Sequence, residues 1–430
     1  MFKELTCNQR KQMRVFASLA LAVACNLCSA QSRPVPAEEQ VTLRAVLREA
    51  LQRYPAALAA HSQVAGAVAE LDKAAAARWP VVGVGASAYQ QSTGTVTRSA
   101  TPQASYTLYA GGGIDAGVQR AQQLLRSAEG KASGTLDDVA QQAAEAYLMW
   151  ARALDQKALA EQNLSALQQM ADDVRKIVAV DAGRAVDLSQ ADVRVNAASL
   201  TVYQRDVELQ QMRARLARYA DALPSAPVGL DDVPVVVPSS LDGALAAMTS
   251  THPLLVQAVA QLEAAKAGVD VARAQNRPKV DWIWSRQVNP FSMQASNLQQ
   301  LSMNMPVFNG GAGEASVRSA AEQVQAAQNT LDEQTLVLRE KISNAWADWA
   351  MAQQRTSLNQ DQAQAGQKLV ESYRLQFRLA RRSLLELLNV QNEAFGYASA
   401  ALQMQYDQRL ARFRLSAAMG ELARAVKGEK

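Results

Sequence analysis

The chain has 430 residues, 49% of them hydrophobic but only 5% aromatic, so its apolar content is mostly Ala, Leu and Val. This composition suits closely packed helices better than a thick globular core. The formal net charge is +4, and +3 of it lies in residues 1–30, where four Lys and Arg residues stand against one Glu. The remaining charge of +1 gives no case for binding to nucleic acid, so no nucleic acid partner is expected.

Residues 1–30 have the layout of a secretory signal peptide. A basic segment runs to Arg14, an apolar run follows, and the small residues Cys28 and Ala30 precede a cleavage site at Gln31. The apolar run is short for a membrane span. All the cysteines of the chain lie in this segment, so the mature protein would be stabilised by burial or assembly and not by disulfides.

Cys25 leaves one alternative open, which is the attachment of a lipid at a lipoprotein signal. Ala22 stands where such signals prefer Leu or Val. Cleavage before Gln31 is therefore the favoured interpretation.

The chain contains an internal repeat with an offset of 198 to 199 residues. The stretch "LRAVLREALQRYP" at 43–55 matches "LDGALAAMTSTHP" at 241–253, and "LYAGGGID" at 108–115 matches "VFNGGAGE" at 307–314. A shared Ala- and Gln-rich composition does not explain the matched prolines and glycine pairs. The expected division is a signal peptide at 1–30, a first repeat at 31–223, a Pro-rich linker at 224–240, a second repeat at 241–422 and a tail at 423–430.

Each repeat predicts a helix, two strands and a long helical hairpin. Apolar residues alternate with small ones in the first strand, where Val82 and Val84 fall on one face and Gly83 and Gly85 on the other. One such strand would more often belong to a soluble sheet. Four of them, each joined to a long helix in an exported chain, indicate the wall of a membrane β-barrel. The strands are expected at about 81–90, 103–110, 279–288 and 298–308.

Glycine pairs are expected to join the strands to the hairpins, as barrel-to-helix junctions. The pairs are Gly111 with Gly112 in the first repeat and Gly310 with Gly311 in the second. In the strand before the second pair, Met303, Met305 and Val307 are expected to face lipid, Ser302 and Asn304 the lumen, and Phe308 the membrane interface.

Two long segments without proline predict the helical hairpins. Proline is absent from Gln103 to Leu223 and again after Pro306. Because proline costs about 3 kcal/mol inside a helix, these segments favour very long helices. Apolar residues seven apart, such as Val317 and Val324, indicate coiled-coil packing. The hairpins are expected at 113–223, with a tip near residue 183, and at 313–422, with a tip near residue 382.

Four strands cannot close a barrel in lipid, where an open edge would leave backbone groups without hydrogen bonds. The chain must therefore assemble with copies of itself. Two copies would give about eight strands around a filled interior, and three would give about twelve around a pore. Gly and Ser on the inward faces favour an open lumen.

The signal peptide, the repeat and the junction "PVFNGGAGEASVRSAA" together resemble the TolC-like outer membrane factor family over about residues 41–422. The resemblance implies a mixed all-α and membrane β-barrel fold. In this fold a homotrimer forms a twelve-stranded outer membrane barrel and a periplasmic α-barrel of coiled-coil helices. It also implies a passive exit duct in outer membrane lipid, gated at its periplasmic end. A periplasmic adaptor (membrane fusion) protein would connect the duct to an inner membrane pump.

The stretch "FRLARRSLLELLNVQNEAF" at 377–395 resembles the tip of the second hairpin in members that serve type I protein secretion. The pump would then be an ABC exporter. Multidrug or small-molecule efflux with a proton-driven pump is the alternative within the family. A periplasmic coiled-coil adaptor or scaffold is the alternative of another class, but it would not need four two-faced strands.

By the same resemblance, the periplasmic gate involves Phe377, Arg382, Glu386 and Asn389. Two of these depart from the family pattern, because Phe377 lacks the hydroxyl of a tyrosine and Asn389 lacks the charge of a carboxylate. The repeat places Asp187 opposite Glu386. We therefore expect Asp187 and Arg382 to latch the closed state while copies of Glu386 face the aperture. The alternative is that these are solvated charges near a turn.

The adaptor is expected to contact the hairpin tips. The tip residues are Gly183, Arg184, Ala380, Arg381 and Ser383. The arginines could instead stabilise the end of the preceding helix, where cations are favoured.

An enzymatic function is not expected. His61 and His252 are the only histidines, and no cysteine of the mature chain could pair with either. The sequence contains no zinc-protease, phosphate-loop or nucleophile-elbow motif. No catalytic residue, cofactor or metal site is therefore proposed.

Overall fold

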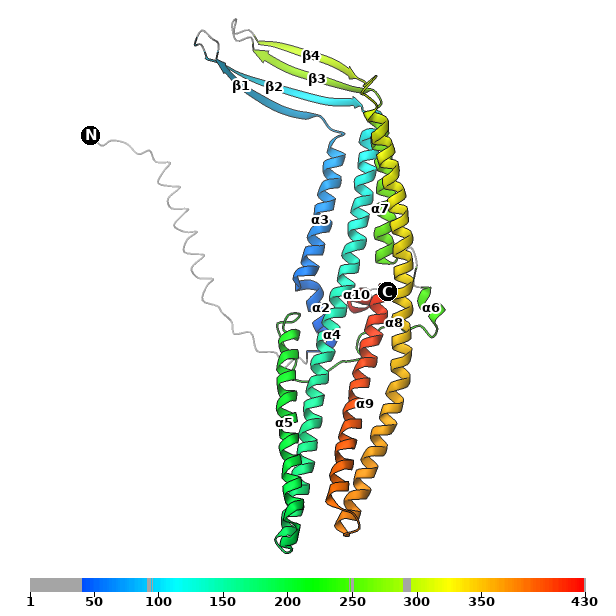
Figure 1. Ribbon diagram of the computed structural model, residues 1–430. Helices are drawn as coiled ribbons and strands as arrows, with labels where there is room; N and C mark the ends of the chain where they lie inside the picture. The colour runs from blue at the N-terminus through cyan, green and yellow to red at the C-terminus, as the bar shows by residue number, and fades with distance from the viewer. Residues whose placement is uncertain are drawn as a thin grey trace, which may run out of the picture. The chain divides into compact units, whose positions relative to one another are not determined.

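The computed structural model describes residues 41–90, 94, 96–246, 248, 251–288 and 295–428. The predicted signal peptide, its cleavage site at Gln31 and the alternative lipid site at Cys25 lie outside these residues. The segment Val41–Lys430 forms one compact unit. In it, long helices carry a four-stranded sheet at one end (Figure 1).

The sequence repeat is also a repeat of structure. The first helix and strand recur 198 residues later, and the second strand and the hairpin recur 199 residues later. The extra residue therefore falls between the paired strands of the second copy. The first copy consists of α3 (Pro55–Ala76), β1 (Val81–Gln90), β2 (Val96–Tyr109), α4 (Gly113–Val178) and α5 (Ala185–Leu216), and the second of α7 (Pro253–Ala274), β3 (Lys279–Val288), β4 (Ala295–Asn304), α8 (Ala312–Arg378) and α9 (Leu384–Ala418).

The sheet is antiparallel throughout, in the order β1-β2-β3-β4. Its register places Val82, Ala104 and Trp284 side by side on one face, and Gly83 beside Gln103 on the other. The apolar face is exposed in the single chain, with Val82 at 76%. The predicted alternation of apolar residues with small or polar ones is therefore in register between neighbouring strands, so the sheet has one apolar and one polar face. The apolar face also carries Val84, Tyr106, Trp282, Leu301 and Met303, and the polar face carries Gly85, Asp281, Ser302 and Asn304.

The second strand is longer than expected, since it begins at Val96 and not near Gln103. Pro102, which has no backbone N–H group to donate, lies inside this strand. However, β2 pairs only with β1 before Gln103, so at Pro102 it has a partner on one side. Proline is tolerated at such an edge because no second strand needs its missing N–H group.

The fourth strand lies earlier in the sequence than expected, since it spans Ala295–Asn304 and not about 298–308. Asn304 pairs with Lys279, the first residue of β3, so beyond this point β4 has no partner strand. Pro306 then offers no N–H group for pairing. The expected strand positions of Met305, Val307 and Phe308 are therefore wrong, and these residues belong to the link that leads into α8.

The first hairpin also ends early, at Leu216 and not near residue 223. After this helix the chain turns so that Tyr219 enters the core, where its ring stacks on that of Tyr54 with 4.9 Å between centroids. Burial and stacking of the two rings stabilise this turn.

A core surrounds the middle of α4 and holds the linker and the C-terminal helix. The buried Tyr147 hydroxyl donates to the Val228 carbonyl at 2.9 Å and accepts from the Val228 N–H at 3.0 Å. Asp137 accepts from the Ala423 N–H at 2.7 Å, and burial raises its pKa to about 6. Two shorter helices, α2 (Leu43–Arg53) and α10 (Leu422–Lys427), pack against α4 in this core. A third, α6 (Leu241–Leu245), packs against α8 in a separate apolar cluster.

The helices of the two repeats pack against one another through α4, which contacts α3, α5, α7 and α9, and through α8, which contacts α7 and α9 (Figure 1). None of the helices in the described ranges is both long and apolar enough to span a membrane.

Gly130 tests the close approach of α4 and α7. An added Cβ would lie 2.8 Å from the Gln257 nitrogen and 3.0 Å from the Pro253 oxygen, so Gly130→Ala should push the helices apart. At Gly134 the nearest atom would be the Pro253 Cβ at 3.8 Å, an ordinary contact. Both changes gain about 1 kcal/mol of helix propensity. We expect Gly130→Ala to lower the melting temperature and Gly134→Ala to keep or raise it. Equal melting temperatures would contradict the packing.

Candidate functional site

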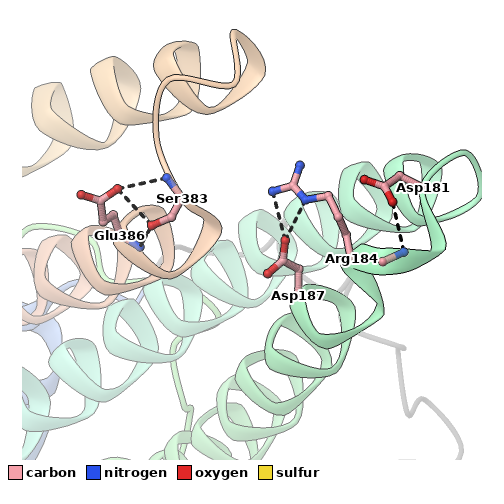
Figure 2. A network of polar contacts seen from close by, with 6 residues as sticks. Asp181, Arg184, Asp187, Ser383 and Glu386 are labelled. Carbon is pink, nitrogen blue, oxygen red and sulfur yellow. Dashed lines mark hydrogen bonds and ion pairs between the residues drawn. The ribbon is translucent and has the colours of Figure 1, made fainter.

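The tip of the first hairpin is held by contacts within itself (Figure 2). It contains a 3-10 turn, η2 (Ala182–Arg184), whose start is capped by the Asp181 carboxylate, which accepts from the Gly183 N–H at 3.0 Å. Arg184 Nε and Nη2 each lie 3.0 Å from Asp187 Oδ2. Asp187 is therefore already paired, one turn away, with a cation of its own hairpin.

The tip of the second hairpin ends α8 and starts α9 with two separate devices. Ala380 has a φ of 54°, and the Arg381 N–H donates to the Gln376 carbonyl at 2.9 Å, which closes the end of α8. Ser383 and Glu386 then form a capping box. In it, Ser383 Oγ accepts from the Glu386 N–H at 3.3 Å and Glu386 Oε2 accepts from the Ser383 N–H at 3.0 Å (Figure 2).

Arg382 is bound on three sides by residues of its own hairpin. Nη1 donates to Glu386 Oε1 at 2.9 Å and Nε to Gln376 Oε1 at 3.0 Å. The guanidinium lies 4.7 Å from the centre of the Tyr373 ring, a cation–π contact. The side chain is therefore pre-positioned at the tip.

The environment of Glu386 favours its charged form. Hydrogen bonds from the backbone and hydroxyl of Ser383, and then the Arg382 guanidinium, hold the pKa of Glu386 below its usual value. Because the pKa is lowered on folding, these contacts stabilise the tip at neutral pH, and this contribution is lost only as the pH falls through the lowered pKa.

Asp187 and Arg382 do not meet within one chain. No hydrogen bond or ion pair in the described ranges joins them, and Figure 2 shows Asp187 and Glu386 on separate hairpins. The latch between Asp187 and Arg382 therefore stays a prediction, now for contacts between copies of the chain.

The other two expected gate residues have partners in this chain. Phe377 is partly buried and packs on an apolar cluster that includes Leu384 and Leu388. Asn389 Oδ1 accepts from Arg194 Nη2 of the first hairpin at 3.3 Å. Asn389 thus contributes a neutral link between the hairpins.

Polar side chains also join α4 to α9, an arrangement that the sequence did not predict. We name these residues the inter-hairpin polar seam. Ser399 Oγ donates to Gln156 Oε1 at 2.9 Å, Gln391 Nε2 to Asn163 Oδ1 at 2.9 Å, and the Tyr406 hydroxyl to Asp155 Oδ2 at 2.6 Å.

The sequence held little signal for this seam. Gln, Asn and Ser on a long helix are ordinarily read as solvated, yet Gln156 is only 5% exposed. Its partner Ser399 lies 243 residues away, which is not the repeat offset. Only the packing of α9 on α4 brings the two together.

The junction glycines have the backbone conformation expected of turns. Gly112 and Gly311 both have a φ of 86° and precede the first turns of α4 and α8. At Gly111 an added Cβ would lie 2.5 Å from the Cβ of Arg277. At Gly310, by contrast, no described atom lies within 4 Å of that position. The two junctions thus have the same backbone conformation but differ in the residues that lie next to them.

Among the described residues, no group of three or more His, Cys, Asp or Glu side chains could hold a metal ion. The tips and junctions consist of helix ends, ion pairs and packing surfaces.

Comparison with known sequences identifies a protein family and individual relatives of this chain. A profile described as "Outer membrane efflux protein" matches residues 46–221 and 245–421, one segment in each repeat. "Outer membrane efflux protein BepC" of Brucella suis is 24% identical over 291 residues, which are 65% of this chain and 63% of that protein, just under two thirds. "Protein CyaE" of Bordetella pertussis is 26% identical over 342 residues, 73% of this chain and 71% of that protein.

Solved structures share the fold. The open state of the Neisseria gonorrhoeae MtrE outer membrane channel superposes with a TM-score of 0.76 at 19% identity and covers 88% of each chain. This likeness confirms the predicted fold class of a tandem repeat with a small membrane sheet and long hairpins. The predicted location, the outer membrane with the helices in the periplasm, is confirmed as well. The profile match covers most of the sequence, and the chain therefore belongs to the outer membrane efflux protein family.

Proposed function

We propose that three copies of this chain close into a passive exit duct that carries cargo across the outer membrane. No catalytic step is part of the proposal. One observation supports it. Inside the chain, β2 and α4 of the first repeat pack against β3 and α7 of the second. The two open edges carry the counterparts of these elements, β4 with α8 at one edge and β1 with α3 at the other.

The contact between the two repeats inside the chain supports a matching contact between the open edges of neighbouring copies. There β2 pairs with β3, α4 packs on α7, and Gly111 lies against Arg277. The repeat offset makes Gly310 the counterpart of Gly111 and Trp79 the counterpart of Arg277. Gly310 has no described neighbour for a Cβ, and Trp79 is 72% exposed. Both would be covered if Trp79 of one copy packed on Gly310 of the next.

The same offset gives the register between copies. The pair Ala104 and Trp284 inside the chain becomes Met303 of one copy opposite Ala86 of the next. Met303 and Ala86 both lie on the apolar face of the sheet, so the lipid-facing surface would continue around the ring. Three copies would give about twelve strands, and small inward residues such as Gly83 would leave the lumen open.

An exposed apolar seam on α5 supports closure of the helical part. Val186, Val193, Leu200 and Val207 lie seven residues apart and are each more than half exposed. This spacing is that of a coiled-coil contact. A neighbouring copy would bury the seam.

A pair of cysteines tests the closure. Ala86→Cys and Met303→Cys lie on opposite edges of one sheet. They are separated by three strand spacings, roughly 14 Å, and by about eight residues along the strands, roughly 27 Å, so a disulfide between them must join two copies. We expect oxidation to give covalent dimers and trimers on denaturing gels, with nothing larger. Val82→Cys with Met303→Cys is the matched control, displaced roughly 13 Å along the strand. A series that stops at dimers, or equal cross-linking of the control, would contradict the proposal.

The latch is tested by comparing variants of both residues. If Asp187 of one copy holds Arg382 of another, then Asp187→Ala and Arg382→Ala should each raise the open fraction in planar bilayers, roughly tenfold for one charge-assisted hydrogen bond. The double variant should add nothing further, because the two residues act as one unit. Arg205→Ala, which breaks a pair with Glu208 far from the tip, is the control.

Additive effects of Asp187→Ala and Arg382→Ala on the open fraction would contradict the proposed latch. In that case Arg184→Ala should reproduce Asp187→Ala, since the pair seen within the first hairpin would be the one that matters.

For the cargo, we favour type I protein secretion, supported by the tip stretch "RRSLLELLNVQNEAF". The energy would come from an inner membrane ABC exporter reached through a periplasmic adaptor. Small-molecule efflux with a proton-driven pump is the second candidate, because the family description and BepC carry the word efflux. A periplasmic scaffold is the third.

Arg381 offers a way to identify the partners. Its side chain is exposed at the tip and forms no ion pair among the described residues. A photoreactive amino acid at this position should capture an adaptor in cells, and His61, exposed on α3, is the control position. Isolation of an ABC exporter with the adaptor would support secretion, and a proton-driven pump would support efflux. Absence from the outer membrane fraction would favour a scaffold.

A further inference from the structure

A cleft of about 680 Å³ lies where the sheet meets the helices. Small and apolar residues from α3, α4 and α7 line it, among them Ala74, Ile114, Gly117 and Val271. Two cations, Arg277 and Lys279, line it as well. The volume is in the range of sites that hold a small molecule.

The cleft lies on the polar side of the sheet. Lys279 and Asn304, which line it, are directly paired across β3 and β4 and share a face with Asp281 and Ser302. In the proposed duct this face is the luminal one. The inference below rests on that proposed function.

The charge at the cleft is positive and only partly neutralised. Lys279 Nζ is paired with Asp281 Oδ2 at 3.1 Å. Arg277 Nη1 donates to the Gly111 carbonyl at 2.9 Å, but no carboxylate in the described ranges lies within ion-pair distance of Arg277. Arg277 therefore keeps a whole positive charge beside an apolar cleft.

The first turn of α4 adds to this charge. At the matching place in α8, Asn309 Oδ1 accepts from the Gly313 N–H at 3.2 Å. In α4 this position is Ala110, whose carbonyl accepts from the Gly113 N–H at 2.9 Å, and no side chain in the described ranges caps the helix start. Asp115 in that turn is paired with Arg78 at 2.7 Å. The start of α4 and Arg277 thus form one positive end of the cleft.

We propose that this cleft binds an amphipathic anion, a molecule with an alkyl chain and a carboxylate or sulfate head. The head lies against Arg277 and the start of α4, and the chain lies among the small residues of α3, α4 and α7. In a trimer, three such clefts surround the lumen at the level of the junction. A molecule of this class then has a binding site inside the duct.

Gly117 allows the cleft to be filled without a clash. No described atom lies within 4 Å of an added Cβ at Gly117, so Gly117→Leu places its side chain in the cleft. Gly268→Leu is the matched control, because Gly268 of α7 has the same free space but does not line the cleft. Both variants replace a helical glycine with a good helix former.

The probe is a diazirine analogue of decanoate, used on the full-length protein in lipid nanodiscs and followed by peptide mapping. We expect labelling at the start of α4 and the end of α7, competed by decanoate but not by uncharged decanol. Gly117→Leu should reduce labelling about tenfold or more, the equivalent of 1.4 kcal/mol, and Gly268→Leu should leave it unchanged.

Equal labelling of the two variants, competition by decanol, or labelling confined to the apolar face of the sheet would each overturn the proposal. Disulfide trimers through Ala86→Cys and Met303→Cys, measured on the same samples, keep the two ideas apart. If these trimers form and labelling fails, the anion site is wrong and the duct stands. If they do not form, the duct itself is wrong.

Discussion

Backbone hydrogen bonding at the edges of the sheet is the constraint on which the rest of the structure depends. The described part of each chain provides four strands, and within it β1 and β4 each have one side with donors and acceptors that no other strand meets. Water satisfies such groups, but hydrocarbon does not. A sheet with one apolar face can therefore enter a bilayer only when its edges pair with other copies. The exposed Trp79, the open Gly310 and the apolar seam on α5 are the side-chain counterparts of this requirement.

Much of the fold was predictable because the sequence contains the same series of elements twice. The glycine pairs located the starts of the long helices α4 and α8, and the alternation of Val82 with Gly83 located the two faces of the sheet. The errors in the strands came where a neighbouring strand decides the outcome. Pro102 is tolerated because β2 has one partner there, and β4 stops at Asn304 because β3 starts at Lys279. Local propensity carries no information about where a partner begins.

The contacts of the candidate sites are also of two kinds, those that follow from local sequence spacing and those that depend on packing between elements. The capping box of Ser383 and Glu386 follows from a local spacing, and so does the ion pair of Arg184 with Asp187, three residues apart. Contacts between elements were not predictable: the seam that includes Gln156 and Ser399 and the cleft beside Arg277 exist only after α9 and α7 pack on α4. In both places polar or charged side chains lie against long helices. The composition of these helices alone does not indicate where such contacts form.

The difference between the two junctions has a consequence for the symmetry of the ring. Three chains with two repeats each would look sixfold, but the boundaries between successive repeats would be of two kinds that alternate. At one kind the peptide chain itself connects the halves, and Tyr147 fastens the connecting segment to α4 through Val228. At the other kind only non-covalent contacts hold the halves together. A widening of the ring would concentrate at the second kind, so the true symmetry of its motion would be threefold.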